Sequence, residues 1–578
     1  MQAPQQPISG DCSTELVDER YCSRRPQLDR KKSIGRRDFL SLATVASAQF
    51  ALGTSLQASG VPGPQMQPTK PHSAEAPTAG LQVFSPVAAR TSNSIAVLWN
   101  KSGNASGQSY DMYLDGKMMA NTKFTDFTFT NLSAGRTYEI ALQVKSEGAT
   151  IVRSQPIRVT TKQEPRVIDI TAHGAVGDGE TLNTKAIQAA IGACSAGGIV
   201  RIPKGVFLSG ALYLKSDMTL LVEHGAVLLG SPHVGDYPLM QYRWEGLEKK
   251  CYASLINTPE AKGTRWHDIT ITGAGTINAN GAALRKAELA EAAGPPGRAV
   301  CIRDTDRVYL YGVTVRQSPA WCVHLIYCSD ISVNGVAIHT KYDEAGVRYA
   351  GMRNGDGLDP DSCKNVFIFD THIASQDDCI ALKSGRDAEG RAVGIPTQNV
   401  RVSHCHFTSG FGVAVGSEMA GGVRDVLVED CVFEDTFSIA SIKAPRGRGN
   451  VLENITYRDC SLSNKSTEHH DSKWFRGALY IDQFYGEDDP NPLLGRQKDD
   501  GTSVIRNVLF QNITLDTVGG NAIYLAGLPE SCLENIRLEN VTATGAQGFL
   551  AYNIRKLTLN HVSVEARTGK SMQVVNVQ

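Results

Sequence analysis

The sequence predicts an all-β protein, in which a small β-sandwich precedes a right-handed parallel β-helix. Three observations indicate this fold class. A short strand-like motif recurs through about residues 165–578, and a region of alternating apolar strands precedes it at 77–162. Glycine is abundant, with 55 of 578 residues, whereas aromatic residues make up only 7%. Such a composition is typical of many short strands joined by tight turns.

The first 60 residues are predicted to be an export signal and leader. Arg36 and Arg37 stand before Asp-Phe-Leu, and a weakly apolar run follows to about Ala58. This pattern resembles a twin-arginine signal, so we expect a periplasmic or secreted protein. The run is too short and too rich in Ser, Thr and Ala to be a membrane span. A polar, Pro-rich linker is expected at 61–76.

Residues 77–162 are predicted to form the small β-sandwich. Strands are expected at 94–99, 110–114, 127–130 and 137–144, separated by Gly, Asn and Ser turns. A buried Trp99 and the segment from Leu132 to Tyr138 resemble a fibronectin type III domain, in which this spacing places a tyrosine corner. Such a domain is an accessory, so we assign it no chemistry.

The rest of the chain, 165–578, carries an internal repeat of short strands that begin with a polar residue. Most starts are 23 to 35 residues apart, which is the length of one solenoid coil. The starts are Asp268, Arg307, Asp330, Asn365, Asn399, Asp425, Asn454, Asn507 and Asn535. One coil cannot bury its apolar face alone, so the coils must stack, with Asn and Asp at the bends bonding to their neighbours. The sequence lacks the repeat signatures of a propeller and of a leucine-rich horseshoe.

One helix is expected, at about 181–194, where apolar residues recur at helical spacing before Gly197 and Gly198. It would cap the first coil. Four stretches fall outside the repeat and are predicted to be loops that wall a binding groove: 232–263, 281–298, 339–354 and 464–503.

Charge and cysteine content exclude several classes of function. Lys and Arg number 58 against 59 Asp and Glu, which gives no indication of nucleic-acid or membrane-surface binding. The 13 cysteines have no metal-site spacing, and Cys379, Cys405 and Cys431 recur at 26-residue intervals, which predicts a buried stack of thiols. We expect a monomer with no metal and no cofactor.

Three aspartates are the candidate catalytic residues. Asp356 precedes the pair Asp377 and Asp378 by 21 to 22 residues, about one coil, so the three carboxylates are expected to cluster on one face. Clustered carboxylates raise the pKa of at least one of them, which suits a general acid beside ionised groups that activate water. The alternative is that they are turn residues or calcium ligands.

A resemblance adds a specific function. In order, the chain carries Asn354-Gly-Asp-Gly, Asp377-Asp378, Gly410-Phe-Gly and Ser441-Ile-Lys443. These motifs resemble glycoside hydrolase family 28, the polygalacturonases, over nearly all of the chain after residue 165. With the leading sandwich, the chain is similar to bacterial exo-acting poly-α-galacturonosidases. The resemblance implies hydrolysis of α-1,4-galacturonosidic bonds of pectin with inversion, releasing mono- or digalacturonate.

The resemblance also implies residue roles. Asp377 would protonate the glycosidic oxygen, while Asp356 and Asp378 would hold and deprotonate the attacking water, across the gap that inverting enzymes leave for it. Lys443 matches a lysine that binds a substrate carboxylate. Lys383 and Arg446 are expected to assist it, because an anionic sugar needs fixed cations in its groove.

Two positions depart from the family pattern. Phe411 replaces a glycine-flanked histidine, and Ser441 replaces the arginine of Arg-x-Lys. Phe411 is predicted either to stack on a sugar or to belong to the core. Three alternatives therefore stay open: a hydrolase of another pectic backbone of rhamnogalacturonan type, a calcium-dependent pectate lyase, and a non-catalytic polysaccharide-binding β-helix.

Overall fold

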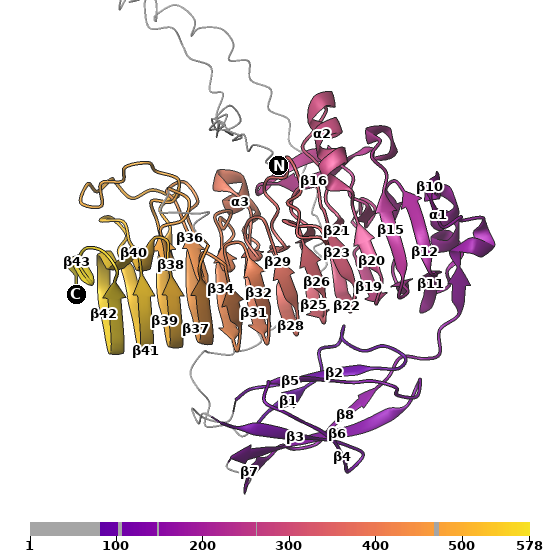
Figure 1. Ribbon diagram of the computed structural model, residues 1–578, viewed down its shortest axis with the longest axis horizontal. Helices are drawn as coiled ribbons and strands as arrows, with labels where there is room; N and C mark the ends of the chain where they lie inside the picture. The colour runs from indigo at the N-terminus through magenta and orange to yellow at the C-terminus, as the bar shows by residue number, and fades with distance from the viewer. Residues whose placement is uncertain (1–80, 102–106, 147–148, 262, 467–472) are drawn as a thin grey trace, which may run out of the picture. The chain divides into compact units, whose positions relative to one another are not determined.

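The structure is a computed structural model that describes residues 81–101, 107–146, 149–261, 263–466 and 473–578 (Figure 1). The predicted export signal at 1–60 and linker at 61–76 lie outside these residues. Within the described residues, no helix has both the length and the apolar character that a membrane crossing requires.

The predicted sandwich is confirmed as two antiparallel sheets. One sheet contains β1 (Val83–Phe84), β2 (Ile95–Trp99) and β5 (Asp126–Phe129). The other contains β4 (Lys117–Thr122), β3 (Ser109–Leu114), β6 (Thr137–Ser146), β7 (Ala149–Arg153) and β8 (Ile157–Thr160). Trp99 is fully buried between them, and the hydroxyl of Tyr138 accepts a hydrogen bond of 2.7 Å from the amide of Ser133. This bond is the expected tyrosine corner, while the fibronectin type III assignment stays a prediction.

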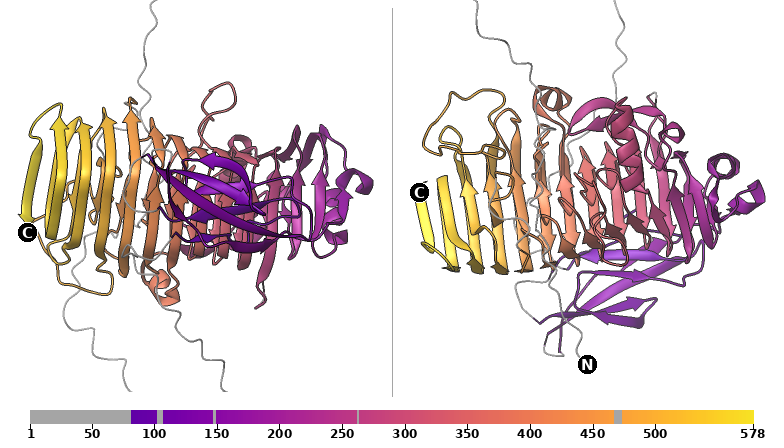
Figure 2. Two further views of the ribbon diagram at one scale, coloured as in Figure 1. Left: turned by 90° about the horizontal axis from the view of Figure 1, so that it is seen from below. Right: turned by 45° about the horizontal axis from the view of Figure 1, so that its top comes forward.

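The remaining strands, apart from one hairpin, form a parallel β-helix with three faces, as predicted (Figures 1 and 2). Face 1 contains β13 (Leu212–Tyr213), β18 (Ile256–Asn257), β21 (Val300–Arg303), β24 (Val323–Ile326), β27 (Leu358–Asp361), β30 (Ile380–Leu382), β33 (Val413–Val415), β36 (Ala440–Lys443), β38 (Gly477–Asp482), β40 (Asn521–Ala526), the start of β42 (Gln547–Ala566) and β43 (Met572–Val577).

Face 2 contains β9 (Val167–Asp169), β11 (Gly198–Ile202), β14 (Met218–Val222), β19 (Trp266–Gly273), β22 (Thr305–Tyr311), β25 (Ser329–Asn334), β28 (Lys364–Phe369), β31 (Thr397–Ser403), β34 (Val423–Glu429) and the first parts of β37 (Val451–Asn464), β39 (Val504–Thr517) and β41 (Leu533–Gly545). Face 3 contains β10 (Asp178–Leu182), β12 (Gly205–Ser209), β15 (Ala226–Gly230), β20 (Thr276–Asn278), β23 (Thr314–Arg316), β26 (Ala337–His339), β29 (His372–Ala374), β32 (His406–Ser409), β35 (Val432–Glu434) and the later parts of β37, β39 and β41.

The polar starts of the repeat form a ladder at one corner of the coils. Every predicted start from Asp268 to Asn535 has a positive φ, between 53° and 61°. Asn535 donates to Asn507 at 2.9 Å and Asn507 donates to Asn454 at 3.1 Å. Asn and Asp tolerate this left-handed conformation better than other side chains do, and Asn can both donate and accept along the stack. The predicted bonding between neighbouring bends is therefore confirmed.

The helices differ from the prediction of a single helix, which is wrong. The expected helix is present as α1 (Thr184–Ala193), whose Ile187 and Ile191 enter the core. The structure adds α2 (Gly281–Glu291) and the short α3 (Asp387–Val393), with 3-10 turns η1 (Ile170–His173) and η2 (Val234–Asp236). The inner side of α2 includes Arg285 and Glu288, so its sequence has no plain apolar stripe.

Two of the predicted loops also contain strands. The stretch 232–263 holds an antiparallel hairpin, β16 (Leu239–Trp244) and β17 (Leu247–Tyr252), as well as β18. The stretch 464–503 contains β38, which is a regular member of face 1. These insertions are therefore added to coils that keep their face 1 strands.

The predicted stack of thiols is present, but one of its members differs from the prediction. Cys405, Cys431 and Cys460 interact on successive coils, whereas Cys379 lies at another corner, where its thiol donates to the carbonyl of Ser409 at 3.0 Å. The equal spacing of Cys379 was misleading, because coil lengths vary. All eleven cysteines among the described residues are free thiols, which agrees with their predicted structural use.

The described residues of the sandwich and of the coils belong to one compact unit. Arg401 of β31 donates to the carbonyl of Trp99 at 2.7 Å and to the hydroxyl of Thr125 at 2.8 Å. Lys101 lies 2.5 Å from Asp430 and 2.6 Å from Asp459. The predicted domain boundary between 162 and 165 stays a prediction.

Candidate active site

Strand register brings the three aspartates together. Leu358 of β27 pairs with Ile380 of β30, so Asp356 and Asp378, each two residues earlier, occupy equivalent positions in adjacent coils. The amide of Gly357 donates to the carbonyl of Asp378 at 2.9 Å, which fixes this register. Asp356 and Asp378 are buried, and Asp377 is partly exposed. Asp377 is therefore the carboxyl of the three that offers most surface to a ligand.

Two lysines neutralise the cluster. Lys443 Nζ lies 2.6 Å from Asp378 Oδ2. Lys383 Nζ lies 3.4 Å from Asp356 Oδ2, 3.6 Å from Asp359 Oδ1 and 3.2 Å from Glu418 Oε2. Burial lowers the pKa of Lys383, but the surrounding carboxylates, Glu418 first, outweigh it and raise that pKa well above its usual value. Lys383 thus serves buried carboxylates, and its predicted contact with substrate stays a prediction.

Burial and mutual repulsion divide the carboxyls into two protonation classes. Burial and then the Asp378 charge raise the pKa of Asp377 to about 6, against the opposing effects of Lys443 and Lys383. Burial also raises the pKa of Asp359 to about 7. By contrast, Lys383 overcomes the effect of burial at Glu418 and holds its pKa well below the usual value. One site therefore combines a carboxyl that keeps its proton in mildly acidic solution with an ionised carboxylate.

Asp356 and Asp359 are both buried and share Lys383 as their charged neighbour, and neither carboxylate oxygen of Asp359 has a hydrogen-bond partner among the described residues. Burial, followed by the charge of Asp359, raises the pKa of Asp356 well above its usual value. Two buried carboxyls that repel each other beside a single ammonium are not both expected to be ionised, because that would leave one buried charge without a partner. Asp378 instead has an ammonium partner at 2.6 Å, and its Oδ1 has no hydrogen-bond partner within the described residues.

Sequence reasoning missed Asp359, which lies two residues beyond the Asn354-Gly-Asp-Gly motif, and Glu418. Asp359 alternates with Leu358 in β27, and its pairing opposite His324 turns it to the outer side of face 1. Glu418 lies in a turn far along the chain, and its carbonyl accepts a 2.7 Å hydrogen bond from the amide of Ser384, next to Lys383. The two-residue alternation of a strand could have identified Asp359, whereas no sequence signal specifies the contact of Glu418.

Phe411 and Arg446 are both engaged by other side chains. Phe411 is 3% exposed and its ring stacks on Phe475 with centroids 3.3 Å apart, beside Phe437. This packing favours the core alternative over sugar stacking. Arg446 is bound by Glu530 at 2.7 Å and by Glu487 at 3.3 Å. Its charge is therefore neutralised within the protein.

The departure at Ser441 is also accommodated. Ser441 Oγ lies 2.7 Å from Ser438 Oγ in the buried strand region of β36. Lys443, two residues on, lies 5.5 Å from the Phe475 ring and 5.4 Å from the Tyr485 ring. The cation of this segment thus sits between the aspartates and two aromatic residues, neither of which the sequence identified.

The hairpin and α2 cover face 1 on the N-terminal side of the aspartates. Met240, Tyr242 and Leu284 pack on outward residues of face 1, including Cys301 and Ile326. Nearer the site, Trp244 stacks on Trp321 with ring planes 8° apart, and Arg243 lies 2.5 Å from Asp361. The loop between β16 and β17 reaches the far side, where the carbonyl of Gly246 accepts a 3.0 Å hydrogen bond from the amide of Arg386. The outer surface is therefore closed directly before Asp356.

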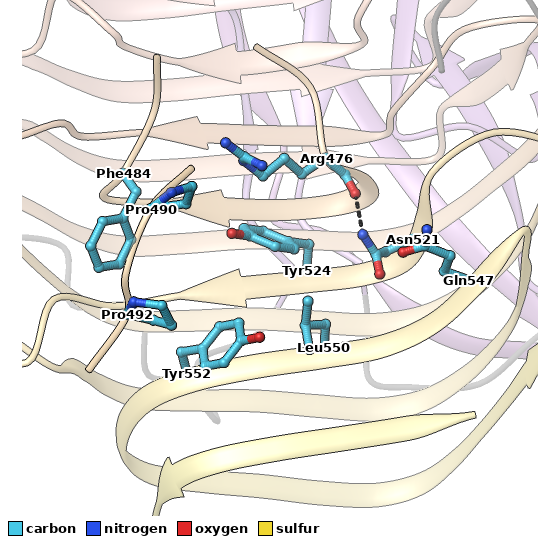
Figure 3. A pocket seen from close by; sticks show the side chains of 9 residues that line it. All are labelled: Arg476, Phe484, Pro490, Pro492, Asn521, Tyr524, Gln547, Leu550 and Tyr552. Carbon is cyan, nitrogen blue, oxygen red and sulfur yellow. Dashed lines mark hydrogen bonds between the residues drawn. The ribbon is translucent and has the colours of Figure 1, made fainter. Parts of the chain in front are cut away.

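A pocket of about 200 Å³ lies further along face 1, on the C-terminal side (Figure 3). Its lining combines aromatic rings, two prolines and polar side chains: Arg476, Phe484, Pro490, Pro492, Asn521, Tyr524, Gln547, Leu550 and Tyr552.

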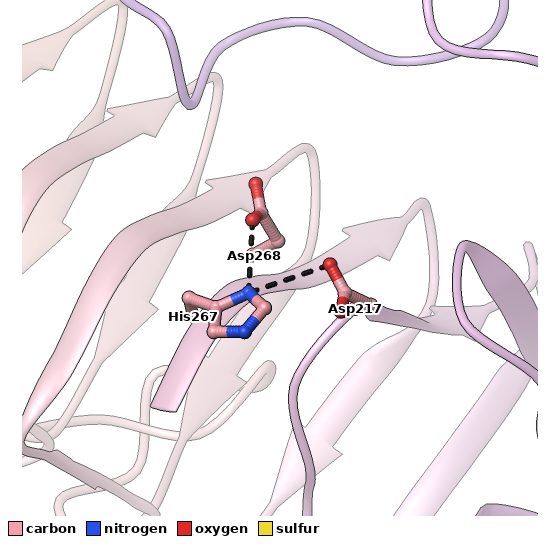
Figure 4. A group of neighbouring side chains, drawn as sticks. All are labelled: Asp217, His267 and Asp268. Atoms are coloured by element: carbon pink, nitrogen blue, oxygen red, sulfur yellow. Dashed lines mark hydrogen bonds and ion pairs between the residues drawn. The ribbon is translucent and has the colours of Figure 1, made fainter. Parts of the chain in front are cut away.

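A second polar group stands at the strand starts of face 2 and differs in kind from the aspartate cluster. His267 Nδ1 lies 3.4 Å from Asp217 and 3.1 Å from Asp268 (Figure 4). Arg307 donates two hydrogen bonds to the same Asp268 carboxylate, at 2.9 and 2.6 Å. These groups are half-exposed and paired with one another, as is usual for bend residues of successive coils.

The aspartate cluster is also a poor calcium site. Calcium takes six to eight oxygen ligands, with carboxylates supplying much of the charge. Here two ammonium groups already occupy the positions beside Asp356 and Asp378. A cation would have to compete with both lysines, so the calcium-ligand alternative has little support from the geometry.

Comparisons with known proteins identify the family of this chain. The model of "Glycosyl hydrolases family 28" matches residues 201–563. A probable polygalacturonase of Vitis vinifera is 31% identical over 383 residues, which are 64% of this chain and 72% of that protein. An exo-poly-α-D-galacturonosidase of Dickeya chrysanthemi is 31% identical over 381 residues, covering 58% of this chain and 61% of that protein.

Solved structures show the same fold. The family 28 exopolygalacturonase of Yersinia enterocolitica superposes with a TM-score of 0.73 at 22% identity, covering 86% of this chain and 98% of that one. An exopolygalacturonase of Thermotoga maritima gives a TM-score of 0.55 at 25% identity, covering 68% and 92%.

Proposed function

The chain belongs to family 28 of the glycosyl hydrolases, and on that premise we propose that it is an exo-acting polygalacturonase. It would hydrolyse α-1,4-galacturonosidic bonds of pectin with inversion and release mono- or digalacturonate. The observation that carries the proposal is the position of the carboxyl cluster immediately beside a closed end of the outer surface.

Each aspartate has a role that its surroundings support. Asp377 is partly exposed and its pKa is raised to about 6, so it would donate a proton to the glycosidic oxygen as the bond to the leaving sugar breaks. Asp378, held by Lys443, would take a proton from the water that attacks the opposite side of the anomeric carbon. Asp356, next to it in register, would hold that water.

Lys443 would have two tasks. Its ammonium forms a 2.6 Å ion pair with Asp378, and it lies 5.5 Å from the Phe475 ring and 5.4 Å from the Tyr485 ring, from where it would also bind a substrate carboxylate. Lys383 is a positioning residue, because it neutralises Asp356, Asp359 and Glu418 from below the surface.

The closed end supports exo action. A polysaccharide that lies across the aspartates meets the Trp244 and Trp321 pair on the N-terminal side. These side chains would limit how far the polymer extends that way, so the end of the chain would be bound there. The rest of the polymer leaves toward the C-terminal coils.

A second candidate is hydrolysis of a rhamnogalacturonan-type backbone. The observation that favours it is Ser441, whose hydroxyl replaces a guanidinium that would clamp a uronate carboxylate. A neutral sugar bound at that position would need no such clamp.

The other regions complete the proposal. We infer export by the twin-arginine-like signal at 1–60 to the periplasm or beyond, and a monomer whose substrate is pectic polysaccharide. Residues 77–162 would be a fibronectin type III-like accessory, supported by the tyrosine corner at Tyr138, and 165–578 the catalytic domain.

The test uses protein without its leader, incubated with polygalacturonate and separately with a rhamnogalacturonan backbone, with and without a chelator. Saturated mono- or digalacturonate released from polygalacturonate despite the chelator, and lost in Asp377→Asn, is the expected result. Release from rhamnogalacturonan alone would favour the second candidate. An ultraviolet-absorbing product that needs calcium would indicate a lyase, and binding with no cleavage of either polymer would contradict hydrolysis.

A further inference from the structure

We propose that the pocket of Figure 3 is an additional subsite, which binds one uronate residue of the polysaccharide several sugar units from the scissile bond. The inference rests on the proposed function, because it assumes that a uronate polymer lies across face 1. It adds a binding site on the leaving side of the groove, beyond Lys443.

The pocket lies where the polymer must pass. Because the outer surface is closed before Asp356, the substrate can extend only over the later coils. Lys443 pairs with Asp482, Asp482 with Ala526, and Ala526 with Tyr552, so one row of outward residues leads from the aspartate cluster into the pocket. Strand β40 is four steps beyond β30, or ~19 Å at the usual strand spacing.

Two short segments connect the pocket with the aspartate cluster. In the first, Phe475 faces Lys443 and the next residue, Arg476, lines the pocket. In the second, Phe484 lines the pocket and the next residue, Tyr485, faces Lys443. The pocket and the cluster thus share a wall, and a chain that leaves the aspartates reaches the pocket without turning away from face 1.

The lining has the chemistry of a uronate site. Tyr552 is partly exposed and offers ring surface to the apolar side of a sugar, and the exposed Gln547 offers an amide to its hydroxyls. Phe484, Tyr524 and Asn521 also line the pocket but are nearly buried. Arg476 supplies the positive charge that a carboxylate requires.

The guanidinium of Arg476 is fixed in place. It donates to the carbonyl of Glu487 at 2.6 Å, lies 3.5 Å from Asp482 and stands 5.9 Å over the Tyr524 ring. Asp482 is already bound by the hydroxyl of Tyr480 at 2.8 Å and the amide of Phe484 at 2.7 Å. A preorganised guanidinium loses little freedom when it binds a carboxylate.

The size of the pocket also fits one unit of a longer chain. At about 200 Å³ it is smaller than the pockets that enclose a free drug-sized ligand, which are roughly 300–1,000 Å³. A single sugar held there gains affinity mainly because it is tethered to sugars already bound at the aspartates.

The experiment compares Tyr552→Ala and Arg476→Gln with the unaltered protein on galacturonate oligomers from dimer to octamer. We expect kcat/KM for the longest oligomers to fall about tenfold in each variant, through a rise in KM, and kcat/KM for the dimer and trimer to stay unchanged. The matched control is Leu494→Ala. Leu494 follows the pocket residues Pro490 and Pro492 in the chain, is 66% exposed and does not line the pocket.

The outcomes separate the two proposals. Equal losses on short and long oligomers, or no loss on either, would overturn the subsite. If the unaltered protein cleaves no oligomer of any length, the proposed function is what fails. Gln547→Ala is a second variant at an exposed rim position, where folding is not at risk, and the same length-dependent rise in KM, of smaller size, is expected of it.

Discussion

Among the individual residues, Asp377 combines exposure with a raised pKa. A general acid must hold its proton before the reaction, so activity should be present below the pKa of about 6 and fall as the pH rises through it. Asp377→Asn should reduce kcat by about 10²- to 10⁴-fold. The measurement is kcat and kcat/KM on polygalacturonate from pH 4 to pH 8.

The residual activity of Asp377→Asn provides the control. It should no longer decline above pH 6, because the group that titrates there is gone. If the alkaline limb is unchanged in this variant, the proton that titrates there belongs to another group. Asp359, whose pKa is raised to about 7, is the first candidate.

Lys383 offers a different test, because it is paired with three buried carboxylates. Its charge lowers the pKa of Asp377 and of Asp356, so Lys383→Met should raise both. We expect the alkaline limb of kcat/KM to move to higher pH, while kcat at the optimum falls because Asp356 ionises less readily. A fall in activity with an unmoved pH profile would indicate loss of structure only, and far-ultraviolet circular dichroism provides that check.

The site could be predicted from sequence only where its residues belong to one local pattern. Asp356, Asp377 and Asp378 are separated by one coil, so the repeat length alone places them together. Glu418, Phe475 and Tyr485 arrive from turns and insertions whose paths no periodicity fixes. Arg446 matched the expected chemistry, but two carboxylates from distant coils neutralise it.

Among the helices, α2 carries a buried acid that the proposed reaction does not use. Burial raises the pKa of Glu288 to about 8, and the amide of Gly297 is its hydrogen-bond donor at 3.2 Å. The folded-state pKa is above the unfolded value, so its stabilising effect is complete below about pH 4.5 and is lost as the pH rises toward 8.

Glu288→Gln should therefore flatten this pH dependence. In the unaltered protein, the titration of Glu288 should lower the free energy of unfolding by up to about 1.4 kcal/mol for each pH unit between pH 5 and pH 8. The variant should lack this contribution. Urea titrations at four pH values measure it. Glu260→Gln, at an exposed position, is the control, and an identical slope in Glu288→Gln and the unaltered protein would contradict the assignment.

The asparagine ladder is a feature of the strand starts and can be tested at Asn507. This residue has φ of +56° and takes part in two ladder hydrogen bonds. Asn507→Ala should cost about 2 kcal/mol, because it loses these bonds and strains the backbone, whereas Asn507→Gly should cost less since glycine accepts the left-handed conformation. Thermal unfolding compares them, and equal costs would show that the backbone conformation contributes nothing.

The elements that repeat are also the ones that sequence predicts. Each predicted strand start coincides with a positive φ, because Asn and Asp are chosen there for a local backbone reason. Helices α2 and α3 were missed for the opposite reason. Polar residues on the inner side of α2 are satisfied by tertiary contacts, such as the 2.6 Å bond from Arg285 to the carbonyl of Pro319, which leave no trace in the local pattern.

In the molecule as a whole, the sandwich and the coils are expected to unfold together. Arg401 connects Trp99 and Thr125 with the buried Glu429, whose carboxylate lies 2.7 Å away. Arg401→Met should cost about 1–3 kcal/mol, because it removes the hydrogen bonds to Trp99 and Thr125 while Glu429 keeps its ion pair with Arg458. Calorimetry should still show one transition, at lower temperature.

The control is Arg506→Met, which removes a half-exposed pair with Glu453 between two coils. Its cost should stay under about 1 kcal/mol. Two separate transitions in Arg401→Met, or in the unaltered protein, would show that the sandwich folds independently of the coils.

The closed end of the outer surface has a consequence for the pectin gel itself. An enzyme that accepts only chain termini shortens each polymer by a unit or two per cut, so viscosity persists while free sugar accumulates. Its throughput then follows the molar concentration of termini rather than the mass of pectin. On long, intact pectin the concentration of termini would limit its rate. Any agent that cleaves the polymer internally would raise that concentration and so increase the rate of sugar release.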